Sequence, residues 1–160
     1  MVKWLGAHPR QPLESLEAAI ARIGAWRELT SKLRPPLGLW AIVPVADPAA
    51  KPIGTALLLP LTTDEVQTEE IEIGWHLHPD QQGKGFATEA AQALLQAAAS
   101  SGIRTVIALT DLDNVRSQAV AVRLGMTDEG TTDRWYGLTT RQFGLDLPPT
   151  ASPQVDGRPR

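Results

Sequence analysis

The stretch EEIEIGWHLHPDQQGKGFATEAAQALLQ, residues 69–96, constrains the fold more than any other part of the chain. Its first half alternates between apolar and polar residues, which is the period of a half-buried β-strand. Its second half carries apolar residues at helical spacing. Gly83 and Gly85 lie between the halves and predict a turn whose backbone can be approached closely. We therefore expect a strand, a glycine loop and a helix in immediate succession.

The alternating strand has one apolar and one polar face, and Pro79 ends it. A polar row on a sheet covered on both sides indicates a wet cleft, whereas the plainer interpretation is a solvent-facing rim. The apolar face comprises Ile71, Ile73, Trp75 and Leu77, and the polar face comprises Glu70, Glu72, His76 and His78. The two histidines form an H-x-H pair, but His8 is the remaining histidine and cysteine is absent, so we expect no metal site.

Periodicity and turn residues assign the rest of the chain. They predict an α/β (α+β) fold in which a mixed, mostly antiparallel central sheet is flanked by helices, with at least one strand–helix–strand crossover. We expect a single domain over 1–147 and a proline-rich, disordered tail over 148–160. The expected helices are 13–27, 87–100 and 114–125, and the expected strands are 39–45, 53–61, 69–79, 104–111, 134–138 and 141–147, the last two being candidates for one hairpin.

Composition excludes several classes of protein. The chain of 160 residues is 42% hydrophobic and 21% charged, which is typical of a globular domain. A net charge of −3 argues against a nucleic-acid partner. No segment reads as a membrane span or a signal peptide. Cysteine is absent, which excludes disulfides and cysteine nucleophiles and fits a cytoplasmic protein.

The glycine loop predicts a phosphate site, because the first amides of a helix lack intrahelical partners and face anions. The P-loop pattern is absent, since Lys84 lies between the glycines and no Gly-Lys-Ser/Thr follows. The Rossmann pattern also fails, since Thr88 stands where its third glycine belongs. A plain glycine-rich turn before a helix remains the alternative.

QGKGFA, residues 82–87, resembles the acetyl-CoA motif [RQ]-x-x-G-x-[GA] of the GNAT superfamily, with Gln82, Gly85 and Ala87 at its fixed positions. The flanks, EIGWHLHPDQQGKGFATEA and NVRSQAVAVRLGM, resemble the Rim-type branch, the ribosomal-protein-alanine N-acetyltransferases. The likeness runs from about Trp40 to Leu147 and continues more weakly back to Val2.

The resemblance implies acetyl-CoA as cosubstrate and an amine acceptor. Leu77 and His78 would lend backbone groups to the pantetheine arm, and Asn114 would lie near the pantetheine or the thiol. In this family the backbone holds the phosphates, so an exposed side chain is the expectation for Lys84. The loop that would cradle the pyrophosphate comprises Gln82, Gly83, Lys84, Gly85, Phe86 and Ala87.

Transfer to an amine requires a base, because amines are protonated at neutral pH. Glu72, on the polar face of the strand, is the first candidate and Glu70 the second. The family commonly places a tyrosine acid where this chain has Ala121. In the Rim-type branch a serine is the suggested substitute, which Ser117 matches, although a first-turn serine also satisfies helix backbone groups. Tyr136 is a further candidate, with strand packing as its plainer interpretation.

A second departure is that family members usually begin with a strand and a helix ahead of the VKWLG-like segment. A missing first strand would expose a sheet edge, so we expect dimerisation or aggregation there. The leading hypothesis is a cytoplasmic, acetyl-CoA-dependent N-acetyltransferase that transfers the acetyl group directly to a primary amine, on a protein N-terminus or a small molecule. The alternatives are a catalytically silent acyl-CoA-binding module and a nucleotide-binding domain.

Overall fold

The computed structural model describes residues 14–46, 49–63 and 66–149. None of the helices in these ranges is long and apolar enough to cross a membrane. The start of the expected first helix, at residue 13, and most of the expected tail lie outside the described residues. The elements in chain order are α1 (Leu16–Lys32), β1 (Gly38–Ile42), β2 (Gly54–Thr63), β3 (Val66–Leu77), the 3-10 turn η1 (Pro79–Gln81), α2 (Phe86–Ser100), β4 (Thr105–Thr110), α3 (Val115–Arg123), β5 (Thr127–Thr132) and β6 (Thr140–Asp146).

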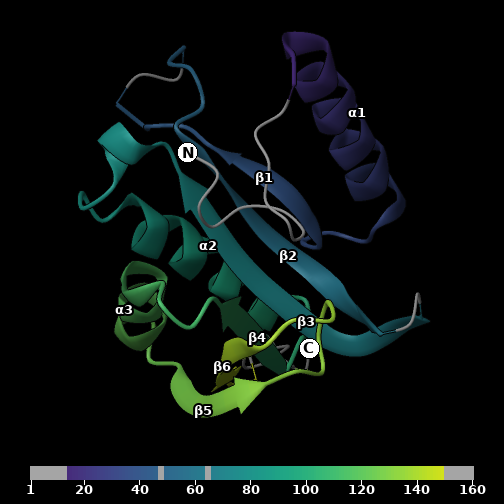
Figure 1. Cartoon of the computed structure of the whole chain (residues 1–160), viewed down its shortest axis with the longest axis vertical. Coiled ribbons are helices and arrows are strands. Elements are labelled where there is room, and N and C mark those ends of the chain that lie inside the picture. Colours follow the sequence, from purple (N-terminus) through teal and green to yellow (C-terminus); the bar gives the residue numbers. More distant parts are fainter. Residues whose placement is uncertain (1–13, 47–48, 64–65, 150–160) are drawn as a thin grey trace, which may run out of the picture.

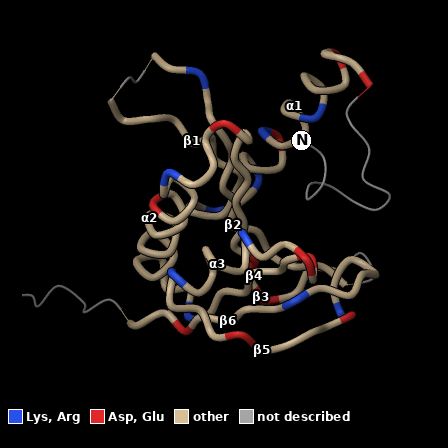
Figure 2. The backbone as a smooth tube through the Cα atoms, turned by 60° about the vertical axis from the view of Figure 1, so that its left-hand side comes forward, with Lys and Arg blue, Asp and Glu red and all other residues tan. Residues whose placement is uncertain are grey.

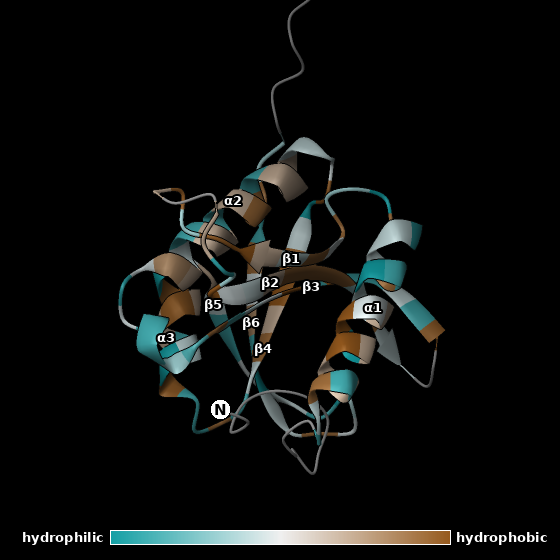
Figure 3. Ribbon diagram, turned by 90° about the horizontal axis from the view of Figure 1, so that it is seen from above, coloured by the Kyte–Doolittle hydropathy of each residue, from teal (hydrophilic) through white to brown (hydrophobic). Residues whose placement is uncertain are grey.

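The six described strands form one sheet in the order β1-β2-β3-β4-β6-β5. Every neighbouring pair is antiparallel except β3 and β4, which are parallel and joined by the crossover helix α2. Figures 1 and 3 show α2 and α3 on one face of the sheet and α1 on the other. Acidic and basic residues are interspersed along the described backbone (Figure 2). The mixed α/β class and the mostly antiparallel sheet are confirmed.

The core lies between the sheet and the helices α2 and α3. The expected apolar face of β3 contributes Ile73, 1% exposed, while Ile71 and Trp75 pack against the cluster. The helix expected at 87–100 is confirmed at Phe86–Ser100, and it buries Ala91, Leu95 and Ala98 against β2 and β3. The core cluster comprises Leu58, Ile73, Ala91, Leu95, Ala98, Val106, Ala108, Ala121, Met126, Phe143 and Leu147.

Helix α1 is longer than expected and buries none of its side chains. Its apolar stripe is not covered by the described residues, since Leu16, Ile20 and Ile23 are 71%, 60% and 52% exposed. The helix begins at the cap Ser15, whose hydroxyl accepts a hydrogen bond from the Ala18 amide. It reaches Lys32 because the paired prolines that stop it come only after Arg34.

The expected strand at 134–138 is wrong. The strand that pairs with β6 is β5, at Thr127–Thr132, and residues 133–139 form the turn between them. The RWYGL segment cannot continue a strand, because Tyr136 and Gly137 both have positive φ, at 58° and 63°. The sequence TDEGTT of β5 carries no apolar alternation that would have revealed it, since β5 lies at the edge of the sheet and is mostly exposed.

Candidate functional site

The loop after β3 has the open backbone that the two glycines predict. Gly83 and Gly85 have φ of 77° and 86°, a region that side chains disfavour. A Cβ at either position would meet nothing within 4 Å, so the glycines serve the backbone conformation and leave space around it. The turn η1 leads into this loop, with the Gln82 amide donating to the Pro79 carbonyl at 3.2 Å.

Helix α2 begins directly after Gly85 and has no side-chain cap. The first backbone hydrogen bond of the helix runs from the Glu89 amide to the Gly85 carbonyl. The amides of Phe86 and Ala87 precede it and, as first-turn groups, have no intrahelical acceptor. Lys84 is exposed and its ammonium donates to Gln81 at 3.1 Å. The loop therefore presents main-chain donors at the positive end of a helix dipole.

Gln82 joins this loop to the two elements on either side of it. Its side-chain amide donates to the Leu77 carbonyl at 3.3 Å, and its carbonyl oxygen accepts from the Arg116 guanidinium at 2.8 Å. Sequence reasoning missed Arg116, which lies in the first turn of α3. Its place between Asn114 and Ser117 was the one available signal.

Strands β3 and β4 pair at a single position, Glu72 opposite Ile107. Beyond it β3 continues to Leu77 and β4 to Thr110 without a further ladder pair between them. The strands therefore diverge toward the glycine loop. The His78 amide donates to the Ile53 carbonyl at 2.8 Å and the Leu77 carbonyl accepts from Gln82, so both groups have protein partners here. Their proposed role in holding a pantetheine arm stays a prediction.

Asn114 and Ser117 lie together at the start of α3, directly after β4. Asn114 is 8% exposed, and its side-chain oxygen caps the helix by accepting from the Ser117 amide at 3.3 Å. Gln118 donates to the Asp111 and Leu112 carbonyls and holds the connection from β4. The structure records no contact between Ser117 and Glu72.

Glu72 and Tyr136, both expected at the site, are in direct contact. The Tyr136 hydroxyl donates to Oε2 of Glu72, although 64 residues separate them in the chain. Glu72 is half-buried on the polar face of β3, and Tyr136 lies in the turn between β5 and β6. Burial raises the pKa of Glu72 above its usual value, and the hydrogen bond from Tyr136 offsets part of the rise.

The contact with Glu72 also changes the pKa of the Tyr136 phenol. Burial of its hydroxyl end, followed by the Glu72 charge, raises the pKa of Tyr136 well above its usual value, although the residue as a whole is 54% exposed. The hydroxyl is therefore protonated at neutral pH and acts as a donor. The expected strand packing is wrong for Tyr136, because its segment forms a turn.

Glu70, the second candidate base, is already committed to another partner. Arg134 donates from Nη1 to Oε1 at 2.6 Å and from Nη2 to Oε2 at 2.9 Å, a bidentate ion pair. Both oxygens of Glu70 are thereby used. Among the described residues, the Glu72 carboxylate accepts one side-chain hydrogen bond, from the Tyr136 hydroxyl.

The two histidines of the polar face have separate environments. Burial lowers the pKa of His76, and His78 adds to the effect. The Nδ1 of His78 accepts from the Asp80 amide at 3.4 Å and lies 3.5 Å from the Asp80 carboxylate. Within the described residues no group of three or more histidine, cysteine or acidic side chains could hold a metal ion.

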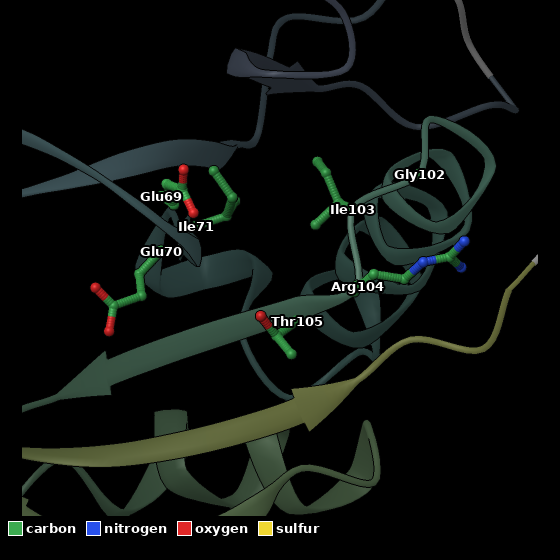
Figure 4. Close-up of a pocket in the computed structure, with 7 residues that line it drawn as sticks. All are labelled: Glu69, Glu70, Ile71, Gly102, Ile103, Arg104 and Thr105. Atoms are coloured by element: carbon green, nitrogen blue, oxygen red, sulfur yellow. The ribbon is translucent and has the colours of Figure 1, made fainter.

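A groove of about 600 Å³ lies at the other end of the divergent strands from the glycine loop. Figure 4 shows it between the start of β3 and the connection from α2 to β4, with Glu70 and Arg104 pointing away from each other. Glu70 and Ile71 line the groove just before Glu72 along β3. Glu72 therefore lies between the groove and the glycine loop along the strand.

The model of the acetyltransferase (GNAT) domain family matches residues 1–127. The chain is 40% identical over 60 residues to the uncharacterized N-acetyltransferase YnaD of Bacillus subtilis, a match that covers 37% of this chain and 35% of the relative. It is 32% identical over 89 residues to the L-methionine sulfoximine/L-methionine sulfone acetyltransferase of Pseudomonas aeruginosa, covering 51% of each. The chain thus spans about half or less of the curated relatives it matches.

Solved structures support the fold. The ribosomal-protein-S5-alanine acetyltransferase of Vibrio fischeri superposes with a TM-score of 0.63 at 18% identity, covering 93% of this chain and 80% of that one. The yncA protein of Salmonella typhimurium, solved with acetyl-CoA, gives a TM-score of 0.61 at 20% identity, covering 88% and 79%. At these identities the likeness concerns the fold.

Proposed function

Because the chain belongs to the GNAT acetyltransferase family, we propose that it transfers an acetyl group from acetyl-CoA directly to a primary amine. One observation carries the proposal. Strands β3 and β4 separate just after Glu72, and the opening ends at an uncapped helix whose loop glycines leave free space. A half-buried carboxylate thus lies at the point where the opening begins.

The residues present fit coenzyme A. The amides of residues 83–87 would hold its pyrophosphate, since nothing fills the space in front of Gly83 and Gly85. Arg116 adds a positive charge next to Gln82. Asn114 would lie near the thiol end, because it follows β4 at the open side of the sheet. Acetyl-CoA supplies the thioester that the amine attacks.

Glu72 is the proposed base, directly or through a water. Its raised pKa brings its proton affinity closer to that of an amine at neutral pH, which favours proton transfer. Glu70 is the weaker candidate, since both of its oxygens accept from Arg134 and an incoming proton would compete with one of those hydrogen bonds.

Tyr136 is proposed as a hydrogen-bond donor to Glu72. Its raised pKa makes it a weak acid, and therefore a poor source of the proton for a departing thiolate. Ser117 remains the candidate to assist the thiolate, because it lies next to Asn114 in the first turn of α3. No covalent intermediate is part of the proposal.

The acceptor amine would approach Glu72 from the groove at the start of β3. In this arrangement the amine would reach Glu72 from one end of the strand and the thioester from the other, so that the reacting atoms meet beside the base. Relatives suggest two classes of acceptor, amino-acid derivatives and protein N-termini, and both belong in the test.

A second copy of the chain is the proposed protein partner. Among the described strands β1 pairs only with β2, so its outer edge can pair with another chain. The exposed stripe of α1 lies beside β1. Light scattering that gives a stable monomer mass at micromolar concentration would contradict it.

The test of the proposed function is release of free thiol from acetyl-CoA with an amine panel. The panel contains alanine- and serine-initiated peptides, L-methionine sulfone and L-methionine sulfoximine. We expect acetyl-CoA, but neither ATP nor NAD, to raise the melting temperature, and at least one amine to release thiol above the hydrolysis rate.

Acetyl-CoA binding without amine-dependent release across the panel would favour the silent acyl-CoA-binding module. Protection by ATP or NAD instead of acetyl-CoA would refute the assignment of the glycine loop.

A further inference from the structure

The turn between β5 and β6 holds Tyr136 in a conformation that a tyrosine disfavours. Its φ of 58° and the 63° of Gly137 place both central residues in the left-handed region, and the Leu138 amide closes the turn on the Trp135 carbonyl at 3.1 Å. For a residue with a Cβ this conformation costs about 1–2 kcal/mol. Other contacts must therefore hold the turn in place.

Trp135 fixes the base of the turn to the hairpin. It is fully buried, and its indole N–H donates to Gln142 on β6 at 3.0 Å. Gln142 in turn donates to Glu129 on β5 at 2.7 Å. These contacts tie Trp135 to its own hairpin but do not direct the turn toward β3.

The Arg134–Glu70 pair connects the turn to β3, as does the hydrogen bond from Tyr136 to Glu72. The Arg134 guanidinium also lies 4.3 Å from the centre of the Trp135 ring, so its position is fixed from two sides. In the sheet order, β4 and β6 lie between β3 and β5. The pair therefore spans elements that share no ladder.

Two contacts join the turn to β3 side by side, the Arg134–Glu70 ion pair and the Tyr136–Glu72 hydrogen bond. Arg134 and Tyr136 are two residues apart, as are Glu70 and Glu72, and each link joins residues 64 apart in the chain. Residues two apart on a strand share a face, so Glu70 and Glu72 meet the turn from the same side. When one link is formed, the other is brought into register.

We propose that Glu70 and Arg134 are positioning residues that hold the Tyr136 hydroxyl on Glu72 and thereby orient the carboxylate of the base. The inference rests on the proposed function, in which Glu72 accepts the amine proton. Neither residue of the pair acts on the substrate itself.

A purely structural role would have small consequences. Arg134 and Glu70 are 55% and 32% exposed, and such pairs contribute about 0–1 kcal/mol to stability. The hairpin provides a matched control in Arg141 and Asp128, another bidentate pair, which joins β6 to β5 and does not reach β3. Replacing Arg134 or Arg141 should change the free energy of unfolding equally little. Only the replacement of Arg134 should change the position of the Tyr136 hydroxyl.

The first experiment needs no activity. Tyr136 is the one tyrosine of the chain, so isotope-labelled tyrosine gives a single ring signal by NMR. On this face β3 carries Glu70, Glu72 and His76, with His78 directly after the strand, and β4 carries no charged residue. We expect the ring signal to shift as Glu72 titrates, and Glu72→Gln to abolish that transition.

Arg134→Met should reduce the amplitude of this transition by half or more, and Glu70→Gln should do the same, while Arg141→Met leaves it unchanged. A full transition in Arg134→Met at the wild-type midpoint would overturn the proposal.

The second experiment measures turnover. Arg134→Met should lower kcat roughly ten- to hundredfold with little change in the KM for acetyl-CoA. In a Tyr136→Phe background the same substitution should have no further effect, because the pair acts through the phenol. Independent losses that multiply in the double variant would overturn the positioning role. If the wild type acetylates no amine, the proposed function fails, and the ring signal still decides whether the pair positions Tyr136.

Discussion

Replacing Glu72 by Gln should stabilise the protein at neutral pH while removing its activity. Burial raises the pKa of Glu72 in the folded protein, which means that the ionised form is disfavoured there. Glutamine has nearly the same shape, carries no charge and retains an oxygen that accepts from Tyr136. The substitution therefore removes the cost of ionisation without leaving the phenol unpaired.

The sign and size of the stability difference between Glu72→Gln and wild type follow from proton linkage. Well below pH 4.5, Glu72 is protonated in both states, so the two proteins should differ least there. As pH rises above 4.5 the unfolded chain ionises first, and wild-type stability falls relative to Glu72→Gln by about 1.4 kcal/mol per pH unit until the folded pKa is passed. Above that pH the difference is constant, and each kcal/mol adds about 2–4 °C to the melting temperature.

Urea unfolding of both proteins from pH 4 to pH 8 measures this difference. Glu69→Gln, which removes an exposed carboxylate from the same strand, is the control for the loss of a charge from β3. Thiol release by Glu72→Gln should fall by about a hundredfold or more, the usual contribution of a general base. Equal stability of Glu72→Gln and wild type at every pH would refute the reasoning, since Glu72 would then titrate alike in both states.

Gly85→Ala and Gly85→Glu should each cost about 1–2 kcal/mol in urea unfolding because of the φ of 86°, but only the glutamate should weaken acetyl-CoA binding by about tenfold or more, as measured by calorimetry. Gly54→Ala should destabilise the junction of β2 and β3 by about 1–3 kcal/mol, because its Cβ would collide with the His76 carbonyl; urea unfolding checks this. Ala121→Leu should lower the free energy of unfolding by a similar amount, since Ala121 is fully buried in the core. A variant as stable as the wild type would show that the core around Ala121 can rearrange.

The features that the sequence predicts well are those encoded by neighbouring residues. The alternation at 69–79 locates β3 and its two faces, and the helical spacing at 87–100 locates α2 within a residue. The paired glycines predict an open loop because only a residue without a Cβ adopts positive φ easily. Each of these signals lies within a few residues of what it describes.

Features that depend on distant partners could not be predicted. Nothing near Glu70 or Glu72 in the chain indicates that their partners lie 64 residues away. The apolar spacing at 13–27 predicts the helix, whereas the surface that covers it is decided by the arrangement of the fold. Ala121 shows the same limit, since its burial in the core could not be inferred from its place in the family motif.

The one expected strand that fails coincides with the candidate site, and the coincidence has a physical basis. Two unfavourable features meet at the contact of Tyr136 with Glu72, a side chain held at positive φ and a carboxylate withdrawn from water. Local propensity at RWYGL favours an extended chain, and the fold overrides it with the buried Trp135 and the Arg134–Glu70 pair. Proteins hold such strained, desolvated groups mainly where chemistry requires them. If the phenol served only to pack the hairpin, a strand would have placed it at lower cost. The turn instead brings its hydroxyl to a carboxylate whose proton affinity is raised by burial, which supports Glu72 as the base.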